Sequence, residues 1–225
     1  MIKQYLKEIL KKNDSILILS AYFYNIYFLN FFFPYKLRGV FLKKTKAQIN
    51  GINNKIICGK KTRLYNCTFY INGDNSVIRI GENCIFKNLE LWIEDNNGII
   101  DIGKNTTIEG GHFAATEGKK IVIGTNCMFS HNAQIRNGDS HPIFDLDTGV
   151  RINEAVSIEI GNNVWFGTNV TILKGSNIAE NSIIGTGSIV SGSCGEKNAI
   201  YVGIPAKKVR GGIRWERLRN VISTT

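Results

Sequence analysis

Apolar residues recur at every sixth position through the last third of the chain. The large members of this series are Ile160, Phe166, Ile172, Ile178, Ile184 and Val190. Four residues after each of them stands a smaller residue: Val164, Val170, Ser176, Ser182, Ser188 and Cys194. This spacing fits neither the 3.6-residue period of a helix nor the two-residue period of an extended strand. Six residues instead supply one short strand and one turn, so three repeats predict a coil of three strands.

The same phrase occurs earlier in the chain at wider intervals. It begins at Ile80, Ile102 and Ile123, and in a degenerate form at Cys58, so successive starts lie 21 or 22 residues apart. We interpret each interval as one coil plus a small corner insertion. One coil cannot bury its own apolar face, so stacked coils must share a core. The pattern therefore predicts an all-β, parallel β-helix over residues 51–210.

Gly and Asn recur where the corners of such coils would fall, as at Gly161 and Asn163. We expect both residue types there to relieve a backbone that needs positive φ angles.

The period fails in one place. Ile123 and Ile160 lie 37 residues apart, close to two coils, yet residues 140–157 do not keep the six-residue count. This segment contains "HPIFDLDTGVRINEAVS", which is polar and rich in turn residues. We predict that a loop of about residues 137–157 protrudes from the solenoid, and that it carries function, because loops on rigid scaffolds commonly do.

Composition narrows the class of protein. The chain of 225 residues is long enough for one domain with an appended arm, and its formal charge is +10. Such a charge suits an anionic lipid surface, a phosphorylated ligand or nucleic acid. The repeat region has no run of basic residues interleaved with aromatic ones, so we expect no nucleic-acid partner.

The five cysteines include no Cys-x-x-Cys pair, and most of them fall at the small position of the repeat. We interpret them as packing residues rather than as a disulfide or metal framework. A reducing compartment, the cytoplasm, follows from that interpretation.

Residues 16–33, "ILILSAYFYNIYFLNFFF", are apolar and aromatic, and lysines flank both ends of the segment. Its length only just reaches that of a spanning helix, the flanking charges give no orientation, and no small-residue cleavage site follows. We predict that residues 1–50 form a helical arm peripherally bound to the inner face of the cytoplasmic membrane. An arm packed on the domain or on a neighbouring subunit, and a true span, remain alternatives. Residues 211–225 are expected to form a tail or a short C-terminal helix.

The segment "IGNNVWFGTNVTILKGSNIAENSIIGTGSIVSG", followed by "VGIPAKKVR", resembles the C-terminal half of bacterial hexapeptide-repeat O-acetyltransferases. The most similar members modify galactosides, capsular polysaccharide and lipopolysaccharide, and the resemblance covers roughly residues 52–210. It implies a left-handed β-helix, acetyl-CoA as co-substrate with no metal, and a hydroxyl of a bacterial surface sugar as acceptor. It also implies a homotrimer with the cofactor in a groove between subunits.

Family members place a catalytic histidine in the loop, and the matching residue is His141 in "GDSHPI". A sugar hydroxyl must lose its proton as it attacks a thioester, and a neutral imidazole can accept that proton. Sialic-acid capsule O-acetyltransferases pair this histidine with a tryptophan in the coil after the loop. The resemblance to them therefore implies that Trp165 in "NNVWFG" is a second catalytic residue. Asp139 is a candidate for orienting the imidazole, or it is simply a turn residue. A backbone N–H near Gly167 or Thr168 is the expected donor to the oxyanion.

The resemblance also proposes cofactor contacts. The pantetheine arm would lie along the coils at Gly167, Thr168, Gly185 and Thr186, and the phosphates would bind Lys207, Lys208 and Arg210. Relatives commonly carry Thr-Lys after "GSIV", whereas this chain has Ser191 and Gly192 there. Ser191 is therefore assigned to the cofactor. The phosphate contact that the family's lysine makes would come from Lys197 instead.

The expected acceptor contacts are His131, Asn132 and Arg136, and His131 is also the second candidate for the base. His112 is expected to pack or to line the groove wall. Three alternatives remain open. The three histidines match in number the zinc site of γ-carbonic anhydrases of this fold, although their spacing lacks a close pair. An amino-sugar N-acetyltransferase and a non-catalytic β-helix scaffold are the other two.

Overall fold

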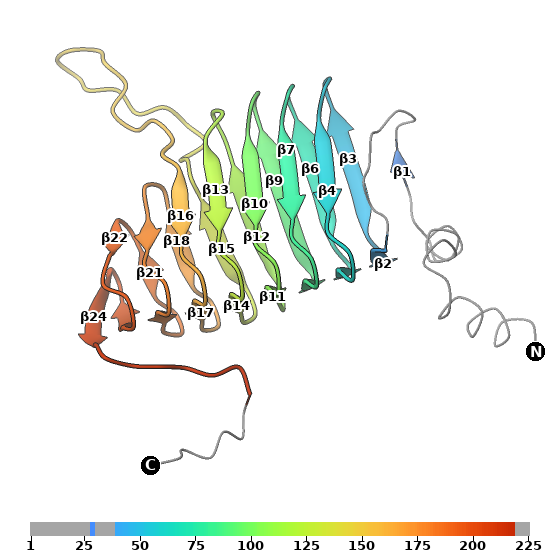
Figure 1. Cartoon of the computed structure of the whole chain (residues 1–225). Helices are drawn as coiled ribbons and strands as arrows, with labels where there is room; N and C mark the ends of the chain where they lie inside the picture. Colours follow the sequence, from blue (N-terminus) through green and yellow to red (C-terminus); the bar gives the residue numbers. More distant parts are fainter. Residues whose placement is uncertain (1–27, 30–38, 219–225) are drawn as a thin grey trace, which may run out of the picture.

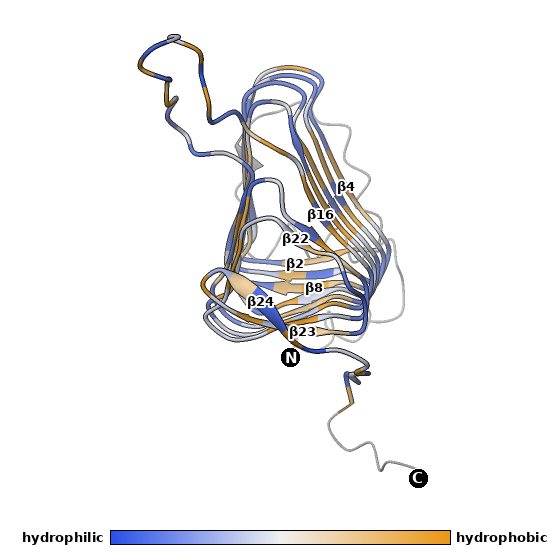
Figure 2. Cartoon of the chain, turned by 90° about the vertical axis from the view of Figure 1, so that its left-hand side faces the viewer, coloured by the Kyte–Doolittle hydropathy of each residue, from blue (hydrophilic) through white to orange (hydrophobic). Residues whose placement is uncertain are grey.

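The strands of the chain wind around three flat sheets, which enclose a prism with a triangular cross-section (Figures 1 and 2). The computed structural model describes residues 28–29 and 39–218. We name the three sheets A, B and C. Consecutive strands of the chain belong in turn to sheet C, sheet A and sheet B, so each set of three strands forms one coil. The parallel β-helix predicted from the repeat is confirmed as a parallel β-solenoid.

Sheet A comprises β1 (Phe28–Leu29), β3 (Lys46–Asn50), β6 (Thr68–Asn72), β9 (Leu89–Glu94), β12 (Gly111–Ala115), β15 (Ala133–Arg136), β18 (Thr171–Leu173) and β21 (Ile189–Val190). Sheet B comprises β4 (Lys55–Cys58), β7 (Val77–Ile80), β10 (Ile99–Ile102), β13 (Lys120–Ile123), β16 (Ile158–Ile160), β19 (Asn177–Ile178) and β22 (Ser193–Cys194). Sheet C comprises β2 (Phe41–Lys43), β5 (Arg63–Tyr65), β8 (Ile85–Lys87), β11 (Thr107–Ile108), β14 (Met128–Phe129), β17 (Trp165–Phe166), β20 (Ile183–Ile184), β23 (Ile200–Gly203) and β24 (Ala206–Arg210). We name the three edges of the prism AB, BC and CA after the sheets that meet there.

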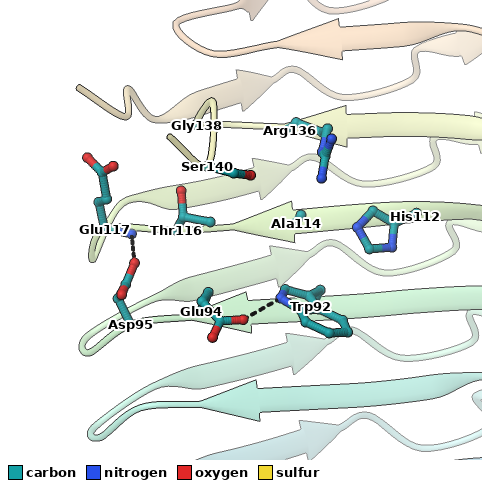
Figure 3. A pocket seen from close by; sticks show the side chains of 10 residues that line it. All are labelled: Trp92, Glu94, Asp95, His112, Ala114, Thr116, Glu117, Arg136, Gly138 and Ser140. Carbon is teal, nitrogen blue, oxygen red and sulfur yellow. Dashed lines mark hydrogen bonds between the residues drawn. The ribbon is translucent and has the colours of Figure 1, made fainter. Parts of the chain in front are cut away.

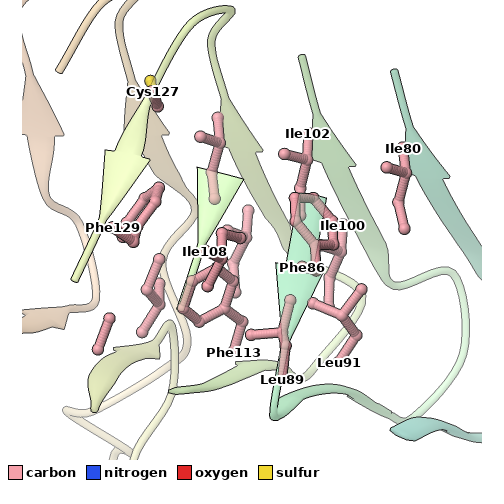
Figure 4. Packing of buried hydrophobic residues seen from close by; sticks show 14 of the residues in the cluster. Ile80, Phe86, Leu89, Leu91, Ile100, Ile102, Ile108, Phe113, Cys127 and Phe129 are labelled. Carbon is pink, nitrogen blue, oxygen red and sulfur yellow. The ribbon is translucent and has the colours of Figure 1, made fainter. Parts of the chain in front are cut away.

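Inward side chains stack from coil to coil in register, so residues of the same type pack against each other in neighbouring coils. On sheet B the stacked residues are Ile56, Ile78, Ile100, Ile121 and Ile158. On sheet C the rings of Phe129 and Phe166 stack with their centroids 4.1 Å apart, and Phe113 of sheet A packs against Phe129 (Figure 4). Each fully buried side chain of this size contributes about 1.5–3 kcal/mol, so the continuous column is the main source of stability.

The cysteines lie inside this column, as the sequence predicted. All five are buried and unpaired, and burial raises the pKa of the Cys58 thiol to about 12 and that of Cys84 to about 11. A thiol with so high a pKa stays protonated and is a poor nucleophile at neutral pH. The cysteines are therefore filling residues of the core.

At the corners Gly and Asn have different roles, although both were predicted to adopt positive φ angles. Asn163 takes the positive φ (56°), whereas Gly161 of the Ile-Gly phrase does not. Gly161 is needed because a Cβ there would lie 2.6 Å from the backbone nitrogen of Glu180 in the next coil. The corner asparagines also bond one another between coils, as Asn126 does to Asn163 (2.7 Å) and Asn163 to Asn181 (3.0 Å). Asn thus serves both the backbone conformation and the stacking of coils.

The ends of the domain differ from the expectation. Strands β2 and β3 pair with β5 and β6, so residues 41–50 belong to the solenoid and not to the arm. Residues 39–218 contain no helix, and the chain after β24 continues without one as far as residue 218. No helix in the described part is long and apolar enough to cross a membrane. The predicted helical arm falls largely on residues 1–27 and 30–38, which lie outside the described residues.

The predicted loop is confirmed in place and in length. Strand β15 ends at Arg136 and β16 begins at Ile158, and residues 137–157 project from the AB edge (Figures 1 and 2). The coils on either side keep register across it, since Ile123 pairs with Ile160. An insertion at one corner therefore leaves the core undisturbed.

Candidate active site

The loop is narrow at its base, where its two arms meet as a short antiparallel bridge between Phe144 and Arg151. The Ile152 N–H donates to the Ile143 carbonyl at 2.9 Å. We call residues 139–143 and 151–155 the neck of the loop. His141 lies in the neck, with an exposed side chain, one residue after the point where the coil ends its regular course.

The buried side chain of Asn153 holds the neck together. Its amide nitrogen donates to the His141 carbonyl (2.8 Å) and to Asp139 Oδ2 (3.0 Å). Its amide oxygen accepts from the Ile143 N–H at 2.6 Å. Three hydrogen bonds of one side chain therefore fix the backbone on both sides of His141. From the sequence Asn153 was only a plausible hydrogen-bonder to the acceptor, whereas in the structure it bonds within the loop. Its only sequence signal was its place among the turn residues of the loop.

The Asp139 carboxylate hydrogen-bonds to Lys174 and Asn153, and no hydrogen bond joins it to the His141 ring among the described residues. The carboxylate accepts from Lys174 Nζ at 2.5 Å as well as from Asn153, and the hydrogen bond from Lys174 lowers the pKa of that carboxyl. The Asp139 carbonyl accepts from the His141 N–H at 2.8 Å, which closes a turn. The arrangement favours the turn interpretation of Asp139 over the orientation of the imidazole, and it ties the neck to the next coil through Lys174.

A second ion pair anchors the far arm of the loop. Arg151 Nη2 lies 2.6 Å from Glu117 Oε1, and Glu117 Oε2 accepts from the Ala155 N–H at 3.0 Å. These hydrogen bonds lower the pKa of Glu117, with the bond from Arg151 as the largest cause. Glu117 belongs to the AB turn of the preceding coil, so the neck is bonded to the coils both before and after it.

Trp165 lies on the other side of the prism. It faces outward on β17 of sheet C, with 36% of its surface exposed, and its ring packs against Trp215 at a centroid distance of 6.0 Å. Sheet C is the side of the triangle that does not touch the AB edge, so the loop projects away from it (Figure 2). One chain therefore does not bring together His141 and Trp165, which the resemblance assigns to one site.

The residues predicted to bind the cofactor divide between two edges. Gly167 and Thr168 lie at the CA edge, directly beneath Gly185 and Thr186 of the next coil, whereas Ser191 lies at the AB edge. The Gly167 N–H donates to the Ile184 carbonyl at 2.8 Å, and the Gly185 N–H does so to Tyr201. These bonds occupy the two glycine amides. Of the two predicted oxyanion donors, only the Thr168 amide has no recorded acceptor within residues 39–218.

The basic residues after the last coil form an edge strand of sheet C. Strand β24 runs antiparallel to β23, with Lys207 and Arg210 exposed. Lys208 pairs with Glu196 at 2.6 Å. These cations share sheet C with Trp165, and not the AB edge with the loop.

The chain after β24 then turns back along sheet C, which the sequence analysis missed. Trp215 is buried and its indole N–H donates to the Asn163 carbonyl at 2.8 Å. Arg217 donates to Thr107 Oγ1 (2.7 Å) and to the Cys127 carbonyl (3.0 Å), and burial lowers the pKa of its guanidinium. Residues 211–218 therefore follow the tail alternative of the prediction, and residues 219–225 lie outside the described residues.

The predicted acceptor residues also separate. His131 and Asn132 form a CA turn, and Asn132 has a positive φ (60°) and donates to Asn169 Oδ1 at 3.2 Å, so it belongs to a corner ladder. Arg136 lies at the other end of β15, at the base of the loop. His112, expected at an inward position, faces outward on β12 and pairs with Glu90 at 2.8 Å. It is a groove wall rather than a core residue, because Phe113 takes the inward place.

A pocket of about 460 Å³ opens on the outer face of sheet A at the base of the loop (Figure 3). Its principal side chains come from three consecutive strands and the loop: Trp92 and Glu94, His112 and Ala114, Arg136, and Ser140. The sequence analysis identified Arg136 and His112 but not the others. Their signal is the 22-residue spacing of Tyr70, Trp92, Ala114 and Arg136, which has meaning only once the length of each coil is known.

No group of three or more His, Cys, Asp or Glu side chains in the described residues could hold a metal ion. The three histidines lie on a CA turn, on the face of sheet A and in the neck of the loop.

The fold and the sequence together define the class of protein. Two solved structures match most of the chain. A polysialic-acid-specific acetyltransferase, NeuO, has a TM-score of 0.65 and 30% identity, over 79% of this chain and 91% of that one. The polysialic acid O-acetyltransferase OatWY has a TM-score of 0.59 and 34% identity, over 80% and 94%. This chain belongs to the hexapeptide-repeat, left-handed β-helix family of O-acetyltransferases.

Curated relatives match over shorter segments. The polysialic acid O-acetyltransferase of Neisseria meningitidis is 51% identical over 70 residues, which are 31% of this chain and 33% of the relative. The enzyme of the same name from Escherichia coli O1:K1 is 37% identical over 112 residues, which are 50% of this chain and 36% of the relative. The matched segments thus span about a third of the length of each curated relative. No family model matches the chain.

Proposed function

We propose that this protein transfers the acetyl group of acetyl-CoA to a hydroxyl of a capsular polysaccharide that contains sialic acid. The similarity to NeuO and OatWY over more than nine-tenths of each of their chains supports this proposal most. The relatives from Neisseria meningitidis and Escherichia coli O1:K1 are polysialic acid O-acetyltransferases, which points to the same acceptor class. The loop that holds one exposed histidine at the edge of a rigid solenoid is the feature of this chain on which the chemistry would rest.

His141 acts as the general base in this proposal. A ring nitrogen accepts the proton of the sugar hydroxyl while the oxygen forms its bond to the thioester carbonyl carbon. The carbonyl oxygen becomes an oxyanion, which a backbone N–H stabilises. The carbon–sulfur bond then breaks, and the imidazolium returns the proton to the departing thiolate. Acetyl passes directly between the two substrates, which agrees with the buried, protonated state of the cysteines.

A complete site requires a second copy of the chain. The His141 loop and the face that carries Trp165, Lys207 and Arg210 lie on different sides of one prism. The loop also exposes apolar side chains: Ile143, Phe144, Leu146 and Ile152. Exposed apolar patches of this kind commonly mark interfaces. A cyclic homotrimer would bring the loop of one subunit to sheet C of the next, with acetyl-CoA in the groove between them.

We also propose that the aromatic and basic composition of residues 1–38 holds the enzyme at the inner face of the cytoplasmic membrane. A chain that begins at residue 39 should then move from the membrane fraction to the supernatant without loss of transfer activity. Unchanged fractionation would contradict this part of the proposal.

The test of the main proposal is acetyl transfer from labelled acetyl-CoA to polysialic acid. The wild-type protein should transfer the label, and His141→Ala should lower kcat by about 10²–10⁴, the usual contribution of a general base. His131→Ala tests the second candidate for the base, and it should keep wild-type kcat because His131 lies on a turn at another edge. If His131→Ala lost activity and His141→Ala kept it, the assignment of the base would be wrong. If the wild type acetylated no sialic-acid polymer, the acceptor would be wrong.

A further inference from the structure

The outer face of sheet A carries one row of side chains in strict register across four coils. Tyr70 on β6 pairs with Trp92 on β9, Trp92 with Ala114 on β12, and Ala114 with Arg136 on β15. Neighbouring strands lie about 4.8 Å apart, so Trp92 and Arg136 stand roughly 10 Å apart, with a methyl group between them. The row therefore has a gap above the small side chain of Ala114. This gap is part of the pocket in Figure 3, and Ala114 lines its floor.

Trp92 forms one wall of the gap in a fixed orientation. Its ring stacks on Tyr70 with centroids 3.6 Å apart and planes at 16°. Its indole N–H donates to Glu94 Oε2 at 2.8 Å. Tyr70 therefore covers one face of the indole. On the β12 side the His112 ring lies 6.1 Å from the Trp92 ring, tilted by 45°, and His112 and Ala114 both line the pocket there. A rigid, flat apolar face beside an open space is the usual stacking surface for a sugar ring.

The carboxylates that line the pocket already have partners. Glu94 accepts from Trp92 and from Asn72 Nδ2 (2.6 Å), and Glu117 pairs with Arg151. Asp95 Oδ2 accepts from the Glu117 N–H at 2.9 Å. Only Glu117 is paired with a cation, whereas Glu94 and Asp95 accept from neutral N–H groups and keep their charge. Arg136 is the one cationic Lys or Arg side chain among the lining residues.

Arg136 forms the other wall and differs from these carboxylates. Its side chain is exposed, and within residues 39–218 no carboxylate lies in ion-pair distance of its guanidinium. In Figure 3 the guanidinium points to the space above Ala114 and beside Ser140. A guanidinium binds a carboxylate with two parallel hydrogen bonds, which fixes both position and orientation.

We propose that Trp92, Ala114 and Arg136 form a slot for one carboxylated pyranose unit of the acceptor polysaccharide. The sugar ring stacks on the face of Trp92 opposite Tyr70, over Ala114, and its carboxylate binds Arg136. This inference rests on the proposed function and names how that site recognises an acidic sugar. Ser140 lines the slot and His141 is the next residue, so a unit held here lies at the base of the catalytic loop.

The slot predicts a particular pattern of kinetics in the full-length protein. Arg136→Gln should raise the KM for short oligosialic acid about tenfold or more and leave kcat within about twofold, because charged hydrogen bonds contribute more to binding than neutral ones. Ala114→Leu should raise KM similarly by filling the gap while Arg136 is intact. Arg79→Gln is the matched control, since Arg79 lies outward on sheet B and should leave KM unchanged.

A chemically altered acceptor separates charge recognition from folding defects. When the carboxylates of the oligosaccharide are reduced to alcohols, wild type and Arg136→Gln should show equal KM values. Wild-type KM values of Arg136→Gln and Ala114→Leu for the acidic acceptor would overturn the slot and leave the acetyl transfer itself established. If the wild type transferred no acetyl, calorimetric titration of His141→Ala with oligosialic acid would still decide. Binding that Arg136→Gln abolishes in that background would support the slot, and binding that survives the change would refute it.

Discussion

The AB edge and sheet C of this solenoid are built from the same repeat and carry different halves of the candidate chemistry. At the AB edge the regular turn is replaced by a loop, and side chains such as Asn153, Lys174 and Glu117 hold it in place. On sheet C the backbone amides are used in bonds between coils, and the functional side chains stand on a rigid ladder. One chain thus offers an exposed imidazole on a clamped loop and a fixed aromatic and basic face, on sides that do not meet.

Because the AB edge and sheet C do not meet within one chain, the proposed site is best tested on an oligomer of several copies. The loop at the AB edge leaves the register of the coils on either side unchanged, since Ile123 still pairs with Ile160. The exposed apolar side chains of the loop and the exposed cations of β24 are both surfaces that a second copy would cover.

The largest expected effect is recovery of activity by mixing two inactive proteins. His141→Ala and Trp165→Ala should each lose at least about tenfold in kcat as pure proteins, because each removes one half of every site. Unfolding and refolding them together should restore about a quarter of wild-type activity, the share of interfaces that combine an intact loop with an intact sheet C. The measurement is acetyl transfer before and after mixing.

The double variant His141→Ala/Trp165→Ala refolded with wild type serves as the control for dilution. Failure of the single variants to complement each other would mean that the two residues do not act in one intersubunit site.

A smaller effect is expected from breaking the neck. Asn153→Ala leaves the Ile143 N–H and the Asp139 carboxylate without one partner each, which costs about 1–3 kcal/mol locally. We expect kcat to fall roughly tenfold, since His141 loses its fixed position, while Tm changes by only a few degrees. Asn177→Ala, an exposed position on β19, is the matched control and should change neither quantity. A large fall in Tm with unchanged kcat would show that Asn153 serves the solenoid rather than the loop.

The neck should also respond to acid. The pKa of Asp139 is lowered by its bond from Lys174, so the stabilisation is complete above the ordinary value of about 3.9 and is lost as pH falls through the lowered pKa. Hydrogen exchange of residues 141–156, corrected for intrinsic rates, should therefore accelerate only in strong acid. In Asp139→Asn the exchange should already be faster at neutral pH and the acid step should be smaller, because only the lowered pKa of Glu117 then contributes to it. An acid step of wild-type size in that variant would assign it to another group.

The smallest effect is expected in the interior that both regions share. The pKa of each cysteine is raised to about 11 or 12 by burial. An aromatic disulfide reagent at pH 8 should therefore leave the native thiols unmodified for hours and titrate all five after addition of denaturant. Rapid reaction of even one native thiol would contradict the packing of the coils.

The sequence by itself determined the solenoid, the bounds of its loop and the inward place of the cysteines. A six-residue period is a local property: it states which residues face inward and where a turn must follow, and both hold in every coil. The loop at residues 137–157 was visible for the same reason, as a failure of that period. Its histidine could be singled out because the resemblance to the family points to one residue in that loop.

Only the tertiary structure decided which of these residues are neighbours. The separation of His141 from Trp165, and of His131 from Arg136, depends on which edge or sheet each residue reaches, and corner insertions change the residue number at which each edge is reached. The repeat indicates coils of 21 or 22 residues, but the register of each strand pair, which puts Tyr70, Trp92, Ala114 and Arg136 in one row, was visible only in the structure. Residues 211–218 run without a helix along sheet C, where Trp215 and Arg217 bond to coils about 50 to 110 residues earlier in the chain. Side-chain bonds over such distances override local helix propensity, since propensity contributes only tenths of a kcal/mol per residue.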